Sequence, residues 1–116
     1  MNLDRIISYC ESFPGTTFEF PFDKTTLVIK VLGKMFLLID IEESTSFNVK
    51  CDPEQALELR ERYASVRPGY HMNKTHWNTI TINGELDEKE LRHWIKHSYD
   101  LVVSKLPKKQ RDELSH

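Results

Sequence analysis

Two adjacent runs of strand-forming residues constrain the fold of this chain more than any other feature. Thr25 to Leu32 reads TTLVIKVL and Met35 to Ile41 reads MFLLIDI, both rich in β-branched and aromatic residues. Gly33-Lys34 between them predicts a two-residue hairpin turn. Every second residue of the later run shares one face, which we expect to lie on the core: Met35, Leu37, Ile39 and Ile41.

The remaining chain predicts further helices and strands around this hairpin. Helices are expected at residues 3–13, from Asp52 to about Tyr63 or Ala64, and from Asp87 to about Leu106, and strands at Thr16–Phe22, Ser46–Lys50, Tyr70–Asn73 and Trp77–Ile82. Asn2, Asp52 and Asp87 with Glu90 are expected to cap the helices. Pro21 would confine the first strand to a sheet edge. The charged tail after Pro107 predicts one or two more helical turns.

The order of these elements, α-β-β-β(-β)-α-β-β-α, predicts an α+β fold. We expect a two-layer sandwich in which an antiparallel sheet carries its helices on one face. The 116 residues fit a single domain, 1–116, because dividing them would leave two marginal cores. One core is expected between the sheet and the last helix, and its predicted members are Leu37, Ile39, Leu91, Trp94 and Ile95.

Charge and cysteine content indicate which class of protein this is and in which cellular compartment it is expected. The chain carries 16 basic and 18 acidic side chains, a net charge of −2, whereas nucleic-acid-binding domains usually show a basic excess. Cys10 falls on the apolar stripe of the first helix and Cys51 lies far from it, which indicates no disulfide framework. The N-terminus lacks the features of a signal peptide, and no apolar run reaches the ~20 residues of a membrane span. We therefore expect a cytoplasmic protein with no membrane partner. The sequence leaves the oligomeric state open, with a monomer favoured.

Few residues have the spacing of a catalytic or metal site. His93 and His97 are four apart on the last helix, but the intervening Trp94-Ile95-Lys96 removes the HExxH pattern, so we expect both on a solvated helix face. Glu42 and Glu43 are adjacent on a strand and point to opposite faces. The sequence has no Walker loop, GxGxxG or Gly-x-Ser-x-Gly motif. It therefore predicts a protein that is not an enzyme and needs no metal or organic cofactor.

Residues 68–80, PGYHMNKTHWNTI, hold the densest polar and aromatic chemistry in the chain. If Tyr70–Asn73 pairs with Trp77–Ile82, residues 73–76 form the tip of a hairpin. One interpretation is purely structural, because Asn and Thr suit turns while Trp and Tyr suit half-buried sheet positions. The other is a wing whose cationic tip contacts phosphate while aromatic and amide groups touch the ligand.

At this stretch the sequence resembles the MmcQ/YjbR family of small bacterial proteins, and the resemblance spans essentially the whole chain. The YHMNK-x-HWNT run is the most specific part of the match. The matching residues are Tyr70-His71-Met72-Asn73-Lys74, His76-Trp77-Asn78-Thr79-Ile80, Ser98-Tyr99-Asp100-Leu101-Val102, Leu106, Arg111, Pro14-Gly15-Thr16 and Phe20-Pro21-Phe22.

The resemblance implies a CyaY-like or secretion-chaperone-like fold and a DNA-binding function through a double wing of hairpins. It supplies no catalytic mechanism. With Arg67 included as a phosphate contact, the candidate nucleic-acid-binding residues are Arg67, His71, Asn73, Lys74, His76, Trp77 and Asn78. The alternative is a protein-interaction or chaperone-like module that holds a peptide on a sheet edge or an apolar patch. A third hypothesis is a small-molecule pocket lined by Tyr70, His71 and Trp77.

Overall fold

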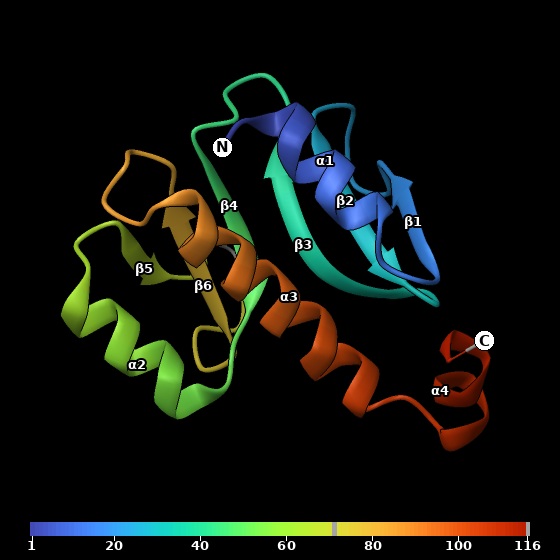
Figure 1. Ribbon diagram of the computed structural model, residues 1–116. Coiled ribbons are helices and arrows are strands. Elements are labelled where there is room, and N and C mark those ends of the chain that lie inside the picture. Colours follow the sequence, from blue (N-terminus) through green and yellow to red (C-terminus); the bar gives the residue numbers. More distant parts are fainter. Residues whose placement is uncertain (71, 116) are drawn as a thin grey trace.

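The protein is described by a computed structural model that covers residues 1–70 and 72–115. Its elements follow the order helix, four strands, helix, two strands and two helices (Figure 1). The helices are α1 (Leu3–Glu11), α2 (Pro53–Arg62), α3 (Glu88–Ser104) and α4 (Lys108–Leu114), and the strands are β1 (Thr16–Glu19), β2 (Thr26–Val31), β3 (Lys34–Asp40), β4 (Ser46–Lys50), β5 (Val66–Pro68) and β6 (Trp77–Thr81). The predicted order is confirmed, and the charged tail forms α4.

The six strands form one antiparallel sheet in the order β1-β2-β3-β4-β6-β5. The first four strands are neighbours in sequence and in space. β6 then pairs directly with β4, and the three-residue β5 takes the outer position. β1 lies at the opposite edge, as Pro21 predicted, although the strand already ends at Glu19.

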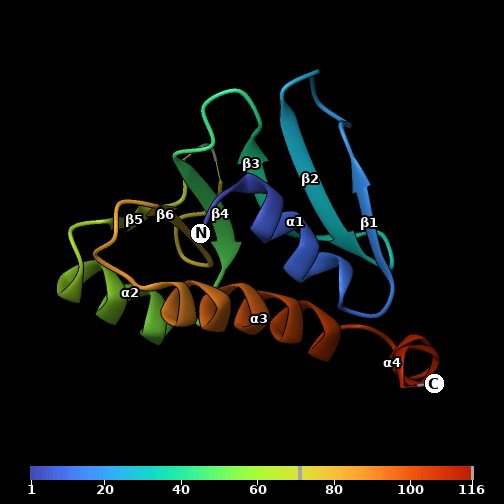
Figure 2. The same cartoon turned by 45° about the horizontal axis from the view of Figure 1, so that its top comes forward.

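Helices cover one face of the sheet, and the main hydrophobic core lies beneath them (Figure 2). α3 packs on β2, β3 and β4, α2 packs on β5, and α1 lies beside α3. The predicted core is confirmed, with Trp94 only partly buried at its border: Leu37, Ile39, Leu91, Trp94 and Ile95. The opposite face, which no described helix covers, carries a small apolar cluster of Val28, Leu38 and Trp77. The α+β two-layer architecture is therefore as the sequence predicts.

A β-bulge corrects the predicted face of Met35. Ile29 pairs with Leu37, but the next residue, Lys30, pairs with Met35, so Phe36 is the extra residue of β3. Phe36 and Leu37 both enter the main core, whereas Met35 packs on the small cluster of the opposite face. A single inserted residue reverses the alternation of the strand, and the sequence pattern carries no sign of it.

The turn between β2 and β3 lies one residue earlier than predicted. Its central residues are Leu32 and Gly33, with φ of 45° and 83°, and Lys34 already pairs with Val31. A type I′ turn requires positive φ at both central residues, which the twist of the flanking strands favours. Leu32 therefore adopts a backbone conformation that its side chain disfavours.

The predicted strand Tyr70–Asn73 is wrong, because β6 pairs with β5 instead. The backbone N–H of Gly69 donates to the carbonyl of Trp77 (2.8 Å), and the N–H of Trp77 donates to the carbonyl of Asn73 (2.9 Å). A Cβ atom on Gly69 would lie 2.7 Å from the Cβ of Trp77, so the two backbones approach more closely there than other residues allow. These bonds place residues 72–76 in a loop that precedes β6 rather than in a strand.

The predicted helix caps are confirmed. The side chains of Asn2 and Asp52 each accept a hydrogen bond from the backbone N–H three residues further on. Asp87 and Glu90 form a reciprocal capping box at the start of α3. Within residues 1–70 and 72–115, no helix is both long and apolar enough to cross a membrane.

Candidate functional site

The face of the sheet opposite the helices is hollowed into a groove of about 1150 Å³, which we call the open-face groove. Residues of β2 to β6 line it, together with segments that border the sheet around Phe22 and around Tyr70. Three of the sequence-predicted site residues are among its lining residues: Arg67, Asn73 and Lys74. In the groove, side chains of residues 68–80 therefore lie next to side chains of the other strands.

The floor of the groove combines apolar and hydrogen-bonding side chains. Met35, Leu38 and Met72 supply apolar surface. Beside them, the hydroxyl of Thr79 donates to Oδ1 of Asn48 (2.6 Å) and accepts the backbone N–H of Tyr70 (3.1 Å). This chain of bonds joins β4, β6 and the loop, and it fixes the position of the loop over the sheet.

The two rims of the groove differ in charge and share exposed aromatic rings. Phe22 is 65% exposed on one side and Tyr70 is 71% exposed on the other. Arg67 and Lys74 line the groove on the Tyr70 side. The remaining ionisable residues of the lining are acidic: Asp23, Asp40 and Glu43. The groove is therefore bipolar, with cations toward one border and carboxylates elsewhere.

Asp23 stays ionised because its carboxylate caps a turn. It accepts the backbone N–H groups of Thr26 (2.6 Å) and Thr25 (2.9 Å). These bonds hold the pKa of Asp23 below its ordinary value, with the bond from Thr26 as the largest cause. The carboxylate of Asp40 likewise accepts the N–H of Glu42 (2.8 Å). Both carboxylates thus stabilise turns at the rim of the groove and also make that part of the rim negative.

Asn73 shapes the loop rather than presenting its amide to a ligand. Its side-chain Oδ1 accepts the N–H of Thr75 (2.9 Å), and its carbonyl accepts the N–H of Trp77. An Asn side chain that bonds the backbone two residues further on is the usual device for starting such a turn. The geometry therefore supports a structural role for Asn73.

Asn78 is fully buried on the helix side of the sheet, where it binds α2. Its Oδ1 accepts Nε–H of Arg60 (2.6 Å), and its Nδ2 donates to the carbonyl of Ala56 (3.4 Å). The guanidinium of Arg60 also donates to the carbonyls of Lys74 and Trp77. Arg60 therefore ties the 73–78 segment to α2, a role that sequence reasoning missed because a basic residue late in a helix gives no such signal.

The other candidate residues divide by exposure. Trp77 is 8% exposed and packs with Val28 and Leu38, so its ring is not presented for stacking. The ammonium of Lys74 lies 3.4 Å from the carbonyl of Gly69, and the side chain is exposed. The side chains of Arg67 and His76 are exposed, and neither forms a hydrogen bond or ion pair with a described residue. His71, also predicted as a site residue, lies outside the described residues.

His97 is not solvated in the way the sequence suggested. It is half-buried, and its Nε2 accepts the backbone N–H of Asp52 (3.2 Å), the N-cap residue of α2. Burial, and then the neighbouring His93, lower the pKa of His97 below its ordinary value of 6.5. Its imidazole therefore acts as a neutral acceptor. Among residues 1–70 and 72–115, no three His, Cys, Asp or Glu side chains gather as metal ligands would.

The two cysteines are buried and unpaired with one another. Burial raises the pKa of each thiol to about 12. Only the thiolate is a strong nucleophile, so neither side chain has the environment of a reactive cysteine. Cys10 lies in the main core, as its place on the helix stripe predicted.

Similar sequences are found among known proteins. The family model described as YjbR matches residues 11–101. The chain is similar to the uncharacterised protein YjbR of Escherichia coli K12, with 30% identity over 112 residues that cover 96% of this chain and 95% of that protein. It is also similar to the uncharacterised protein YbdF of Escherichia coli O157:H7, with 39% identity over 92 residues that cover 78% and 75%.

Solved structures show the same fold. The crystal structure of Deinococcus radiodurans protein DR2400, of the domain DUF419, matches with a TM-score of 0.92 and 40% identity, covering 98% of this chain and 88% of that one. A crystal structure of a protein from Pseudomonas syringae matches with a TM-score of 0.74 and 29% identity, covering 87% of this chain and 98% of that one. The α+β fold of this chain is therefore shared with these solved structures.

Proposed function

This chain belongs to the YjbR family, and on that premise we propose that it is a binding protein whose open-face groove holds an extended segment of a partner polypeptide. The observation that carries the proposal is the bipolar groove itself. Arg67 and Lys74 lie toward one border, three carboxylates lie elsewhere in the lining, and apolar side chains lie on the floor. The proposal includes no catalytic step.

A polypeptide suits this groove because it can present both signs of charge and apolar side chains within one segment. Carboxylates of the partner would lie by Arg67 and Lys74, and basic groups by Asp23, Asp40 and Glu43. A segment of about ten residues extends over ~33 Å as a strand. The whole molecule measures 39 × 32 × 26 Å, so a segment of that length would cross it. The exposed rings of Phe22 and Tyr70 would add aromatic contact area at the rims.

A second candidate function is binding of nucleic acid, and the cluster of Arg67, Lys74 and Tyr70 favours it. Cationic side chains beside an exposed ring suit phosphate contact and base stacking. The exposed imidazole of His76 lies in the same loop. Against it stand the net charge of −2 and the carboxylates of the groove, which would repel a long polyanion. Any such ligand is therefore expected to be a short single-stranded segment.

NMR titration of the isotope-labelled protein tests the proposal. The probes are a peptide of about ten alternating Val and Thr residues with Lys at its N-terminal end and Asp at its C-terminal end, a peptide of the same core without charges, and single-stranded oligothymidine of equal length. The bipolar peptide is expected to shift the amide signals of Leu38, Asn48 and Thr79 saturably, and the uncharged peptide less. Signals of α3 are expected to stay in place.

The double variant Arg67→Glu/Lys74→Glu is expected to weaken binding of the bipolar peptide about tenfold, since it removes ~1.4 kcal/mol of interaction. The matched control is Lys108→Glu/Lys109→Glu, which makes the same charge change on exposed residues of α4. If oligothymidine alone shifts the groove signals, and Arg67→Glu/Lys74→Glu abolishes that effect, the nucleic-acid function replaces the polypeptide function. Linear, unsaturable shifts with every probe would reject both.

A further inference from the structure

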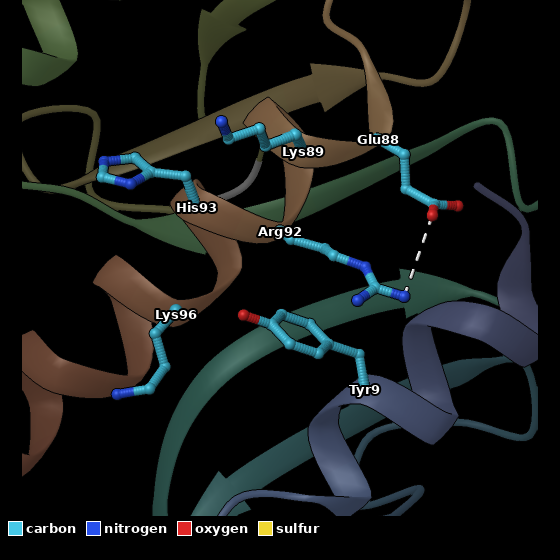
Figure 3. Close-up of a pocket in the computed structure, with 6 residues that line it drawn as sticks. All are labelled: Tyr9, Glu88, Lys89, Arg92, His93 and Lys96. Atoms are coloured by element: carbon cyan, nitrogen blue, oxygen red, sulfur yellow. Dashed lines mark ion pairs between the residues drawn. The ribbon is translucent and has the colours of Figure 1, made fainter.

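We propose a second binding site, for a phosphate group, in the pocket between α1 and α3 on the helix side of the molecule. This α1–α3 pocket has a volume of about 540 Å³ (Figure 3). Arg92 reaches from α3 toward the ring of Tyr9 on α1, while Lys89, His93 and Lys96 follow on successive turns of α3. The pocket lies on the other side of the sheet from the open-face groove, and it does not depend on the function proposed for that groove.

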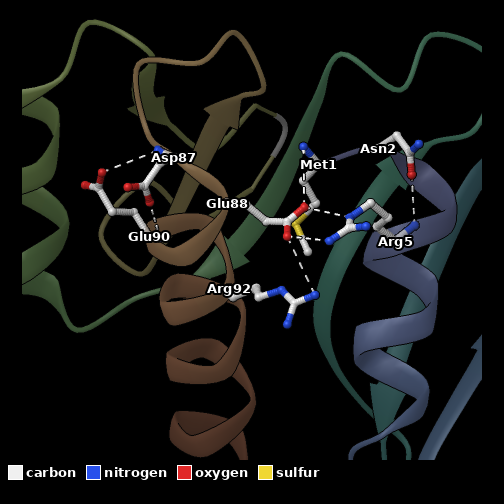
Figure 4. A network of polar contacts seen from close by, with 7 residues as sticks. All are labelled: Met1, Asn2, Arg5, Asp87, Glu88, Glu90 and Arg92. Atoms are coloured by element: carbon white, nitrogen blue, oxygen red, sulfur yellow. Dashed lines mark hydrogen bonds and ion pairs between the residues drawn. The ribbon is translucent and has the colours of Figure 1, made fainter.

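The charge of the pocket is positive although the whole chain carries −2. Three permanent cations line it, and Glu88 is its one acidic residue. That carboxylate is already compensated by cations (Figure 4). Arg5 donates to it through two bonds, of 2.6 and 2.5 Å, and the N-terminal ammonium and Arg92 lie within 3.8 and 3.7 Å. Arg5 is the largest cause that holds the pKa of Glu88 below its ordinary value.

Aromatic rings hold two cations of the pocket, Arg92 and Lys96, in place. The guanidinium carbon of Arg92 lies 5.0 Å from the ring centroid of Tyr9. Nζ of Lys96 lies 5.3 Å from the ring centroid of Tyr99 and 5.7 Å from that of Phe13. Lys96 also forms an ion pair with Asp100 (2.5 Å), for which an anionic ligand would compete. Side chains that are already positioned lose less conformational entropy when a ligand binds.

One hydrogen-bond donor in the pocket lacks an acceptor. Nε of Arg92 is buried and has no hydrogen-bond partner, and it is the only side-chain nitrogen or oxygen in this position among residues 1–70 and 72–115. A buried donor without an acceptor is costly, and proteins rarely keep one without a reason. The Arg92 side chain as a whole is 43% exposed, and a shift of it toward the pocket would let an oxygen of a bound anion accept from this Nε.

A phosphate group matches this set of donors better than a carboxylate does. Its several oxygens can accept from more than one donor of the pocket, and Arg and Lys are the side chains that bind phosphate most often. The phosphate can come from two sources, a free polyphosphate or nucleotide, or the backbone of a nucleic acid. The chemistry of recognition is the same for both, so the experiment has to separate them.

Titration with inorganic pyrophosphate at constant ionic strength, followed by amide and imidazole NMR signals, tests the site. Saturable shifts are expected at Lys89, His93 and Lys96, and chloride and sulfate at the same ionic strength should not reproduce them. Lys89→Gln/Lys96→Gln is expected to raise the dissociation constant at least tenfold. The control Lys108→Gln/Lys109→Gln removes the same charge from α4, beyond the C-terminal end of α3 (Figure 1), and should change it less than twofold.

Repeating the titration with oligothymidine identifies the source of the phosphate. Shifts of α3 with both probes point to a nucleic-acid backbone, and shifts with pyrophosphate only point to a small phosphorylated ligand. The site is overturned if the shifts do not saturate, if sulfate or chloride produces the same shifts, or if the α4 control weakens binding as much as Lys89→Gln/Lys96→Gln. The groove variant Arg67→Glu/Lys74→Glu should leave pyrophosphate binding unchanged, which separates this site from the proposed function.

Discussion

Single residues that stand out in the sequence hold the backbone together at positions far apart in the chain. The hydroxyl of Ser98 on α3 donates to the carbonyl of Phe36 (2.5 Å) and accepts the N–H of Lys50 (2.8 Å). It therefore satisfies two backbone groups, one of them at the β-bulge of β3. The hydroxyl of Tyr99 donates to the carbonyl of Pro14 (2.6 Å). This bond joins α3 to the segment between α1 and β1. These residues of the family pattern have structural roles.

Ser98→Ala is expected to lower the free energy of unfolding by about 1–3 kcal/mol, because it leaves a buried carbonyl and N–H without their partner. Urea denaturation followed by tryptophan fluorescence measures the change. Ser104→Ala is the matched control, since its hydroxyl is exposed and bonds the carbonyl of Leu101 in its own helix. Equal effects of the two substitutions would contradict a stabilising role for the two hydrogen bonds of Ser98.

His97 makes stability depend on pH. Its folded pKa lies below its ordinary value, through burial first and His93 second, while Asp52 and Asp100 act in the opposite direction. The contribution of the neutral imidazole is therefore complete above pH 6.5, the unfolded value, and is lost as pH falls through the folded pKa.

His97→Gln keeps an acceptor that can reach the N–H of Asp52 but removes the titration. We expect the urea midpoint of the parent to fall more steeply than that of His97→Gln as pH is lowered from 8 to 5. Parallel curves over this range would show that His97 does not couple folding to protonation.

At the level of elements, the loop of residues 72–76 depends on α2 for its shape. Arg60 joins the two through Asn78 and through the carbonyls of Lys74 and Trp77. The loop in turn forms one border of the open-face groove. The position of Lys74 over the groove is thus set from the other side of the sheet.

Arg60→Ala is expected to destabilise the fold by about 1–3 kcal/mol, because the buried Oδ1 of Asn78 loses its charged donor. Amide hydrogen exchange of Trp77 and of residues 73–75 should accelerate more than exchange in β2 and β3. Arg62→Ala, an exposed neighbour on the same helix that contacts the ring of Tyr63, should cost less than about 1 kcal/mol. Unchanged exchange in the loop of Arg60→Ala would show that the loop holds its shape independently of α2.

At the level of the whole molecule, α3 supplies the second layer and closes the core over β2, β3 and β4. Ile95 is fully buried there, and Leu91 and Val102 continue its apolar stripe. Trp94 lies at the border, where its ring contacts His93 and His97 at centroid distances of 4.8 and 5.1 Å. The two adjacent residues therefore contribute differently to the stability of the same interface.

Ile95→Ala is expected to cost about 2–5 kcal/mol of unfolding free energy through lost apolar contact and the cavity left behind. Trp94→Ala should cost less than Ile95→Ala despite removing more atoms, because its ring is only partly buried. Urea denaturation of both variants measures the difference. The reverse ranking would place the Trp94 ring in the core and contradict this orientation of α3.

The sequence by itself determined the layers and most elements of this protein. Hydrophobic periodicity and caps identify the helices, and β-branched runs identify β2, β3, β4 and β6, because these signals arise from neighbouring residues. The sequence did not predict the two places where the strand register shifts by one residue. Neither the bulge at Phe36 nor the turn at Leu32-Gly33 follows from local preference, since each is set by pairing with another strand.

Only the tertiary structure decided which residues of the 68–80 stretch can reach a ligand. Asn73, Trp77 and Asn78 have the side chains of a binding motif, yet they bond the loop, the sheet and α2. Asn78 and Trp77 contact residues that are distant in sequence, above all Arg60. The α1–α3 pocket and the bipolar groove likewise join residues from separate elements. A residue type states what bonds a side chain can make, but burial and packing between distant segments decide which partner it has.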